Sequence, residues 1–240
     1  MQNWLRSSRQ QIDRDLAQSL HRRYFSAAFL AQYKAVLPAI DRHVRGKVID
    51  LGCGTMPFRE TLSDKAEVYH TLELRPTSEE TTYVGDIQDM HMIENGLYDS
   101  ILCLEVLEHI PSPCMALREM HRILAPGGMV ILSVPHLSRL HEEPYDFYRY
   151  TTHGLHYLLE EHGFEVLEIR EKGGLFSFLG HQISTICLGM VWPVPGMRQL
   201  IWFLNKWLIT LPSYGLDQIV DRSGIFALGY VGIARKTSEG

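Results

Sequence analysis

A glycine-containing turn and three acidic residues are the groups in this sequence whose types and spacing point most directly to a bound ligand. Asp50-Leu51-Gly52-Cys53-Gly54 closes a short apolar segment, and glycines at such a place permit a tight turn and close approach of the backbone to a ligand. Glu73 and Asp86 follow the next two apolar segments. Any one of these acids alone could be a solvated loop charge, but acids at three successive segment ends favour a ligand that carboxylates hold.

The same turn disfavours a dinucleotide. The fingerprint Gly-x-Gly-x-x-Gly needs a third glycine so that a helix packs closely and its N-terminus binds a pyrophosphate. That position is Pro57 here. The sequence therefore argues against an NAD-linked oxidoreductase, and a ligand with positive charge and no phosphates suits the acids better.

A second group of candidate residues lies at 136–151, after the fifth strand that the pattern predicts. It contains histidines, acids, tyrosines and an arginine: His136, His141, Glu142, Glu143, Tyr145, Asp146, Tyr148 and Arg149. His141 is our first candidate for a general base, because an imidazole with an ordinary pKa of about 6.5 can accept a proton at neutral pH. His109 is the second candidate. Asp146 is a third candidate catalytic residue, which could pair with Arg149 or touch a substrate.

The two histidines have plainer alternatives. His141 could cap or hydrogen-bond its own loop, and the pair Glu108-His109 could orient the helix that follows the fourth predicted strand. None of the twelve histidines has the His-Glu-x-x-His spacing or a similar pattern of ligands, so we expect no required metal.

The elements that must position these residues alternate between strands and helices. The pattern predicts strands at 47–51, 68–74, 83–84, 99–104, 129–134, 164–169 and 226–234, and helices at 57–62, 115–124 and 152–162. Pro126-Gly127-Gly128 is expected to end the second of these helices, and Thr151 or Thr152 to cap the third. Pro38 is expected to interrupt an N-terminal helical region. The alternation and the nearly continuous apolar strands indicate an α/β fold with a doubly wound, mostly parallel seven-stranded sheet, in which ligands bind beyond the carboxyl ends of the strands.

The segment Val48-Ile49-Asp50-Leu51-Gly52-Cys53-Gly54 resembles the first motif of the class I S-adenosylmethionine-dependent methyltransferases. The stretch from Tyr98-Asp99 through Glu105-Val106-Leu107-Glu108-His109-Ile110 to Pro126-Gly127-Gly128 is similar to later motifs of the ubiquinone/menaquinone-biosynthesis type. The resemblance covers about residues 46–170 and implies a Rossmann-like methyltransferase fold with S-adenosylmethionine as cofactor. It implies these cofactor-binding residues: Asp50, Gly52 and Gly54 at the methionine end, Glu73 with Leu74 at the ribose, Asp86 with Ile87 at the adenine, and Cys103 with Leu104 nearby.

The segment 141–151 resembles one found in many members of that family, several of them from sugar and cell-envelope pathways. This likeness implies a role on the side of the methyl acceptor without identifying the acceptor.

An apolar stretch near the C-terminus departs from the usual core of that family. Residues 173–197 contain no Asp, Glu, Lys or Arg, and roughly fifty residues, 173–222, separate the last two predicted strands. We therefore expect an N-terminal helical cap at 1–45, a cofactor-binding core at 46–172 and 223–236, and a hydrophobic helical insertion at 173–222. The helical spacing of the cap rests on Leu5, Ile12, Leu16 and Leu20.

Three roles for this insertion stay open: a lid or substrate wall, a contact with a membrane surface through 175–211, and a homodimer surface. Trp192, Trp202 and Trp207 would suit a membrane interface or an apolar acceptor site equally well. A spanning helix is less favoured, because 175–192 is close to the minimum length and carries polar residues.

Composition limits the class of protein and its partners. With 45% hydrophobic and 21% charged residues the chain is typical of a globular protein. A formal net charge of −5 without a run of like charges argues against a nucleic-acid partner. Four scattered cysteines fit free thiols in a reducing compartment. Residues 1–15 lack the apolar core of a signal peptide, so we expect a cytoplasmic protein, membrane-associated if the insertion meets a membrane.

The function that we expect is S-adenosylmethionine-dependent methyl transfer to a small or lipid-linked acceptor, in particular O-methylation of a glycan or envelope-type intermediate. C-methylation of a quinone-like lipid would use the same fold and insertion and would not need His141. A non-catalytic cofactor-binding partner protein, in which the insertion serves assembly, is the third alternative. The acceptor, the methylated atom and the oligomeric state stay open.

Overall fold

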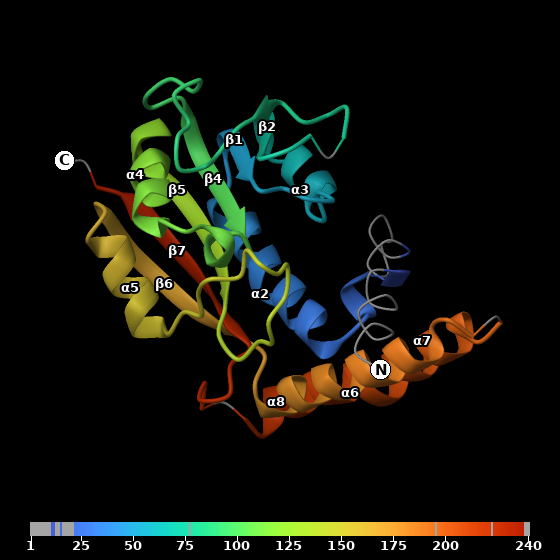
Figure 1. The fold of residues 1–240 in the computed structure, drawn as a ribbon. Helices are drawn as coiled ribbons and strands as arrows, with labels where there is room; N and C mark the ends of the chain where they lie inside the picture. The colour runs from blue at the N-terminus through green and yellow to red at the C-terminus, as the bar shows by residue number, and fades with distance from the viewer. Residues whose placement is uncertain are drawn as a thin grey trace. The chain divides into compact units, whose positions relative to one another are not determined.

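The computed structural model describes residues 11–12, 15, 22–76, 78–194, 196–221 and 223–237 (Figure 1). Leu5, Leu16 and Leu20, on which the predicted N-terminal helical spacing largely rests, lie outside the described residues. The described elements follow one another as η1 (Arg22–Tyr24), α2 (Ala27–His43), β1 (Gly46–Leu51), α3 (Arg59–Ser63), β2 (Ala66–Glu73), β3 (Tyr83–Val84), β4 (Tyr98–Leu104), η2 (Leu107–His109), α4 (Pro113–Ile123), β5 (Leu124–Pro135), α5 (Thr152–Glu160), β6 (Phe164–Lys172), α6 (Leu175–Val191), α7 (Arg198–Asn205), η3 (Lys206–Thr210), α8 (Leu211–Ile219) and β7 (Gly229–Lys236).

The chain divides into two compact units. We call Met1–Lys34 with Glu171–Leu228 the helical unit, and Ala35–Arg170 with Gly229–Gly240 the sheet unit. Every candidate catalytic and cofactor-binding residue named above belongs to the sheet unit.

Seven strands form one sheet in the order β3-β2-β1-β4-β5-β7-β6. The pairs β1–β2, β2–β3, β1–β4 and β4–β5 are parallel, whereas β7 pairs with β5 in the antiparallel direction. The strand order reverses at β1, because β2 and β3 lie on one side of β1 while β4 and β5 lie on the other. This arrangement confirms the prediction of an α/β, doubly wound, mostly parallel seven-stranded sheet.

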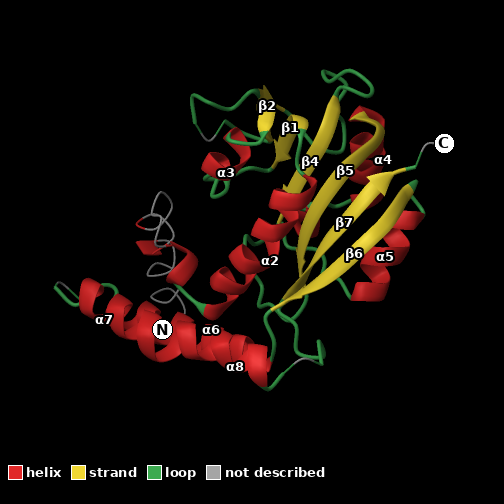
Figure 2. Cartoon of the chain, turned by 180° about the vertical axis from the view of Figure 1, so that it is seen from behind, coloured by secondary structure: helices red, strands yellow, loops and turns green. Residues whose placement is uncertain are grey.

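Helices cover the sheet so that its central strands are buried on both faces. Figure 1 shows α4 and α5 on one face, and Figure 2 shows α2 on the other, where its residues Val36, Ala39 and Ile40 are wholly buried. Consecutive side chains of the central strands are likewise buried: Val48 and Ile49 in β1, Ile101, Leu102 and Cys103 in β4, and Val130, Ile131 and Leu132 in β5. Strands covered on both faces carry continuous apolar sequence, which explains why their pattern was readable.

Two proline-containing segments that the sequence analysis expected to interrupt or end helices do not do so. Pro38 lies inside α2 and does not interrupt it, because buried neighbours on both sides of it hold the helix in place at the cost of one backbone hydrogen bond. Pro126-Gly127-Gly128 lies inside β5, and α4 has already ended at Ile123. The register between β4 and β5 shifts there, and Gly127 takes a φ of +73°, so these residues form an irregularity at the start of a strand. At α5 the capping prediction is confirmed, since the Thr151 hydroxyl accepts a hydrogen bond from the Gly154 N–H.

The helical unit is held together by polar groups as well as by an apolar cluster. The buried Asp217 carboxylate of α8 accepts hydrogen bonds from the N–H groups of Gly174, Phe176 and Ser177 at the start of α6, at 2.8–2.9 Å. Its apolar cluster consists of Ile12, Phe25, Leu188 and Trp192, with Phe29, Ile201 and Trp202 packed against it.

The outer surface of these helices is apolar. Its exposed large side chains are Leu179, Ile183, Ile186 and Met190 in α6, Leu200, Phe203 and Leu204 in α7, Trp207 and Leu208 in η3, and Leu216 and Ile219 in α8. The three tryptophans of the predicted insertion therefore differ: Trp192 and Trp202 belong to the apolar cluster, whereas Trp207 is half exposed. Among the described residues no helix is both long enough and apolar enough to cross a membrane.

Candidate active site

The loops after β1, β4 and β5 leave the sheet at the same edge. β4 lies between β1 and β5 and is parallel to both, with Cys103 paired to Leu51 on one side and to Leu132 on the other. The carboxyl ends of parallel neighbours share one edge, where ligands of this kind of sheet bind. The glycine turn after β1, the helical turn η2 after β4 and the loop 136–150 after β5 are therefore brought to one edge of the sheet unit.

Gly52 is the most constrained point of this edge. Its φ is +67°, and a Cβ at this position would lie 2.4 Å from Cγ2 of Val106 in the loop after β4. The turn needs glycine for its left-handed backbone and also because the neighbouring loop passes directly against it.

Asp50 is a buried carboxyl at the end of β1. It accepts a hydrogen bond from the Tyr69 hydroxyl, with 3.0 Å between Oη and Oδ2. Burial raises the pKa of Asp50 to about 7, against the hydrogen bond from Tyr69, which lowers it, and with a smaller increase from the nearby Glu73. Its charge is therefore sensitive to any cation that comes close.

Glu73 and Gly54 make a contact that joins the ends of β2 and β1. The Gly54 N–H donates to Glu73 Oε1 at 2.5 Å. Gly54 has a φ of +53°, and a Cβ built there would meet nothing within 4 Å, so the space in front of the turn is open. An open turn beside a half-buried carboxylate fits a nucleoside whose ribose hydroxyls donate to Glu73.

The other predicted cofactor residues lie in different environments. Asp86 Oδ1 accepts hydrogen bonds from the N–H of Gln88 at 2.8 Å and from its Nε2 at 3.1 Å, so this carboxylate closes its own loop. Ile87 is buried behind it and Leu74 is largely exposed. Cys103 is wholly buried between β1 and β5, and burial raises the pKa of its thiol well above the ordinary value.

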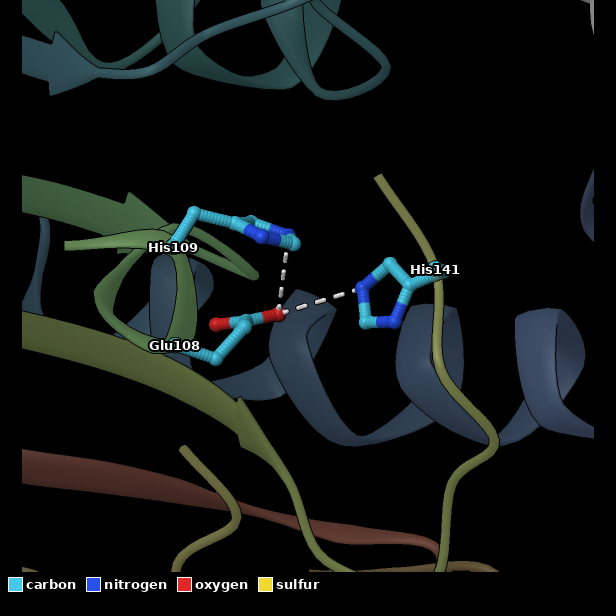
Figure 3. A group of neighbouring side chains, drawn as sticks. All are labelled: Glu108, His109 and His141. Carbon is cyan, nitrogen blue, oxygen red and sulfur yellow. Dashed lines mark ion pairs between the residues drawn. The ribbon is translucent and has the colours of Figure 1, made fainter. Parts of the chain in front are cut away.

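Three side chains from the loops after β4 and β5 meet at the other part of this edge. Figure 3 shows Glu108 and His109 from η2 and His141 from the following loop, turned toward one another. Glu108 Oε1 lies 3.7 Å from Nε2 of His109 and 3.7 Å from Nε2 of His141. We call Glu108, His109 and His141 the Glu-His-His trio.

Glu108 is wholly buried, and neither oxygen of its carboxylate has a hydrogen-bond partner among the residues that the structure describes. Burial raises the pKa of Glu108, an effect that His141 opposes. The contact with Glu108 raises the pKa of His141 in turn.

The Nδ1 atoms of both histidines face oxygen acceptors. His109 Nδ1 lies 2.6 Å from the carbonyl oxygen of Tyr145. His141 Nδ1 lies 3.3 Å from the carbonyl oxygen of Arg139 and 3.4 Å from Asp146 Oδ2, both nearer than Arg149 Nη2 at 3.5 Å. A carbonyl oxygen can only accept a hydrogen bond, so these contacts favour the tautomer with the proton on Nδ1, which leaves Nε2 facing Glu108.

Asp146 and Arg149 form an ion pair within the loop 136–150. Arg149 Nη1 and Nη2 donate to the two oxygens of Asp146 at 2.6 and 2.7 Å, and this pairing lowers the pKa of Asp146 to about 2. Asp146 also accepts from the backbone N–H of His141 at 2.8 Å. Of the two roles considered for Asp146, its contacts are those of a residue that positions His141.

Two acids of this site were missed as site residues in the sequence. Glu108 was read only as a neighbour that orients a helix, although an acid beside a histidine directly after a buried strand is a signal that could have singled it out. Glu105 has a φ of +57°, and Ser133 donates to its Oε1 at 2.5 Å, which ties the end of β4 to β5. Of the remaining candidates, Glu142, Glu143 and Tyr145 have exposed side chains, although the Tyr145 carbonyl oxygen contacts His109. The His136 ring lies beside the Tyr230 ring, and the Tyr148 hydroxyl donates to the Pro111 carbonyl.

Comparison with known proteins places the chain in a family. A family model described as a methyltransferase domain matches residues 19–169, more than half of the chain. Curated relatives named ubiquinone biosynthesis O-methyltransferase include that of Vibrio vulnificus, 30% identical over 111 residues, covering 41% of this chain and 47% of the relative. The protein of that name from Xanthomonas oryzae pv. oryzae is 29% identical over 100 residues, covering 36% and 42%. The chain spans about half the length of the curated relatives that it matches.

Solved structures share the fold at low sequence identity. An S-adenosylmethionine-dependent methyltransferase from Mesorhizobium loti has a TM-score of 0.55 at 17% identity, covering 86% of this chain and 98% of that one. The 1,6-didemethyltoxoflavin-N1-methyltransferase of Burkholderia thailandensis, solved with S-adenosylhomocysteine, has a TM-score of 0.55 at 14% identity, covering 98% and 86%. The [4+2]-cyclase SpnF has a TM-score of 0.56 at 16% identity, covering 88% and 79%, so this fold also serves other chemistry. By its family model, its first motif and its sheet order, this chain belongs to the methyltransferase-domain family of class I S-adenosylmethionine-dependent methyltransferases.

Proposed function

We propose that this protein binds S-adenosylmethionine at the carboxyl ends of β1, β2 and β3 and transfers its methyl group to a hydroxyl oxygen of a small or lipid-linked acceptor. The observation that carries the proposal is the arrangement of one sheet edge. An open glycine turn held by Glu73 lies at one half of the edge, and two imidazoles whose Nε2 atoms face Glu108 lie at the other half.

The cofactor half suits a positively charged nucleoside. Asp50 and Glu73 supply negative charge at the ends of neighbouring strands, and Gly52 and Gly54 let the backbone come close. Asp50 would face the methionine end and Glu73 the ribose hydroxyls. Asp86 and Ile87 would flank the adenine, with Leu74 and Cys103 contributing from the strand ends.

The acceptor half suits an oxygen nucleophile. The cofactor supplies a methyl group that is already activated by a sulfonium, so the protein has to align the acceptor and remove the proton of its hydroxyl. When no metal ion is bound, Nε2 of His141 is the atom that can take this proton, and the His109 ring lies next to it. Asp146 and Arg149 hold His141 in place.

The named relatives and the surface of the helical unit support a lipid-linked acceptor. The relatives named ubiquinone biosynthesis O-methyltransferase favour a hydroxyl on a lipid-linked ring. The exposed apolar surface of α6, α7, η3 and α8 favours a protein that meets a lipid-linked glycan or envelope intermediate at a membrane surface.

Calorimetric titration of the purified protein with S-adenosylmethionine, and in parallel with NADH, tests the cofactor. We expect binding of the first alone, weakened in Glu73→Gln and unchanged in Glu67→Gln, a matched change at the exposed other end of the same strand. Failure of the folded protein to bind S-adenosylmethionine would overturn the proposal.

Methyl-labelled S-adenosylmethionine then tests the reaction, with a membrane lipid extract and a water-soluble catechol as acceptors. We expect a labelled product in which one hydroxyl of the acceptor has become a methyl ether. A labelled product that keeps all its hydroxyls would indicate C-methylation instead, and cofactor binding without turnover on either acceptor would favour the non-catalytic alternative.

A further inference from the structure

We propose that the Glu-His-His trio is a binding site for one divalent transition-metal ion, coordinated by Glu108 Oε1, His109 Nε2 and His141 Nε2. The proposal concerns metal binding and does not depend on methyl transfer. Only the link to the acceptor, drawn below, rests on the proposed function.

The spacing of the three atoms fits a coordination shell. One ligand atom from each residue can be chosen so that all lie within 4.8 Å of one another, and two of the three separations are 3.7 Å. Tetrahedral ligands at about 2.0–2.1 Å from a zinc ion are about 3.4 Å apart. Small movements of the side chains would therefore bring all three atoms to coordination distance of one ion.

The same separations are those of long ion pairs and exceed the length of a hydrogen bond between a ring and the carboxylate. A charge-assisted hydrogen bond between imidazolium and carboxylate is about 2.7–2.9 Å long. Glu108 Oε1 stands 3.7 Å from both rings instead, between two nitrogen atoms and on a carboxylate that accepts no hydrogen bond from any described residue. A buried carboxylate without hydrogen bonds is costly, and a cation between these atoms would satisfy it.

The surroundings of the rings match those of metal-binding histidines. Such histidines almost always donate their other ring N–H to a carbonyl or carboxylate, which fixes the tautomer and the ring orientation. His109 has the Tyr145 carbonyl in this position, and His141 has the Arg139 carbonyl and Asp146. Arg149 in turn holds Asp146. Both rings are thus oriented with Nε2 toward Glu108.

The ligand types select the kind of ion. Two imidazole nitrogens favour zinc, cobalt, nickel or iron, whereas Mg²⁺ and Ca²⁺ prefer oxygen ligands. Three protein ligands leave at least one position open, as in catalytic rather than structural sites. The partial exposure of His109 and His141 leaves a side of the site from which a ligand can approach.

On the proposed function, the open position would take the acceptor hydroxyl. An ion there lowers the pKa of an oxygen that coordinates it, so the hydroxyl proton would leave to solvent as the oxygen attacks the methyl carbon and the carbon–sulfur bond breaks. In that state His141 serves as a ligand and not as the base.

Metal titration of the purified protein, without an affinity tag and treated beforehand with a chelator to remove bound metal, tests the site without cofactor or acceptor. Co²⁺ is the probe, because the visible spectrum reports its coordination, and Zn²⁺ is then added in competition. We expect one equivalent of Co²⁺ to bind and Zn²⁺ to displace it, with Mg²⁺ unable to do so. Glu108→Gln and His141→Ala should each weaken Co²⁺ binding by about tenfold or more.

His153→Ala, an exposed histidine at the start of α5, is the matched control and should bind Co²⁺ as the parent protein does. Circular dichroism of each variant separates loss of the site from loss of the fold. The proposal is overturned if the parent protein takes up no stoichiometric Co²⁺, or if folded Glu108→Gln and His141→Ala both bind it undiminished. Metal binding without S-adenosylmethionine binding would instead contradict the proposed function and still support this metal site.

Discussion

The two halves of the carboxyl edge differ in one buried acid. On the side of β1, β2 and β3, Asp50 accepts a hydrogen bond from Tyr69, Glu73 from Gly54 and Asp86 from Gln88. On the side of β4 and β5, Glu108 is wholly buried, yet its oxygens accept no hydrogen bond from any described residue.

This difference separates a preformed half from an incomplete one. The cofactor half is complete with protein groups alone, so its shape exists before any ligand arrives. The acceptor half leaves an anion and two lone pairs facing one another, an arrangement that the protein satisfies fully only when a proton or a cation joins it. The following experiments test this contrast from the largest expected effect to the smallest.

Replacing the turn glycines tests how rigid the cofactor half is. Gly52→Ala should lower the free energy of unfolding by about 2–4 kcal/mol. This value adds the cost of an alanine in left-handed backbone to the cost of its clash with Val106. Gly54→Ala should cost only about 1 kcal/mol, because its Cβ would meet no other atom. Urea denaturation measures both values, and equal losses would contradict the contrast between the two positions.

Exchanging one acid in each half tests whether the halves are independent. Glu73→Gln should weaken S-adenosylmethionine binding by roughly 10- to 100-fold, the value of a charged hydrogen bond, and leave Co²⁺ binding unchanged. Glu108→Gln should do the reverse. Calorimetry with each ligand on each variant decides the matter, and a variant that loses both ligands would show that the two halves are one site.

The pH dependence of cofactor binding tests the role of Asp50. Its pKa is raised from 3.8 to about 7, with Tyr69 and Glu73 as its polar neighbours and Cys53 nearby. Below this pH the carboxyl is protonated and must lose a proton before it can attract a positively charged ligand. The Kd for S-adenosylmethionine should therefore rise about tenfold for each pH unit below 7 and level off above it.

The same shift has a consequence for stability without ligand. Since the folded pKa of Asp50 lies above its ordinary value, the folded state holds a proton that the unfolded state has already lost, and Asp50 makes folding less favourable as pH rises from about 4 to 7. Asp50→Asn should remove this contribution and also flatten the binding profile. A binding profile that keeps its slope in Asp50→Asn would assign the titration to another group.

A change behind His141 tests the supporting contacts of the acceptor half. Asp146→Asn removes the charge near His141 Nδ1 and half of the pairing with Arg149, and should weaken Co²⁺ binding by about tenfold. Glu143→Gln, an exposed acid of the same loop, should leave it unchanged. Undiminished Co²⁺ affinity in Asp146→Asn would mean that backbone carbonyls alone orient the ring.

Local chemistry made much of the molecule predictable from sequence. Gly52 and Gly54 take positive φ angles, as expected of glycines after a strand, and Thr151 caps α5. The buried strands are recognised by their continuous apolar residues. These features depend on residues close together in the chain, so each carries its own signal. The strand and helix alternation then leaves little choice of architecture.

Features decided by distant packing escaped sequence reasoning. Pro38 continues a helix because the buried neighbours of that helix outweigh the lost hydrogen bond. Pro126 lies within a strand because β4 pairs with Leu124 before it and with Met129 after it. Glu108 and His141 lie far apart in the chain and meet only because β4 and β5 end side by side. No spacing rule for metal ligands applies to residues on two separate loops. The sequence by itself determined the fold and the glycine turn, whereas the tertiary structure alone brought the Glu-His-His trio together, because that contact depends on strand pairing and not on neighbours in the chain.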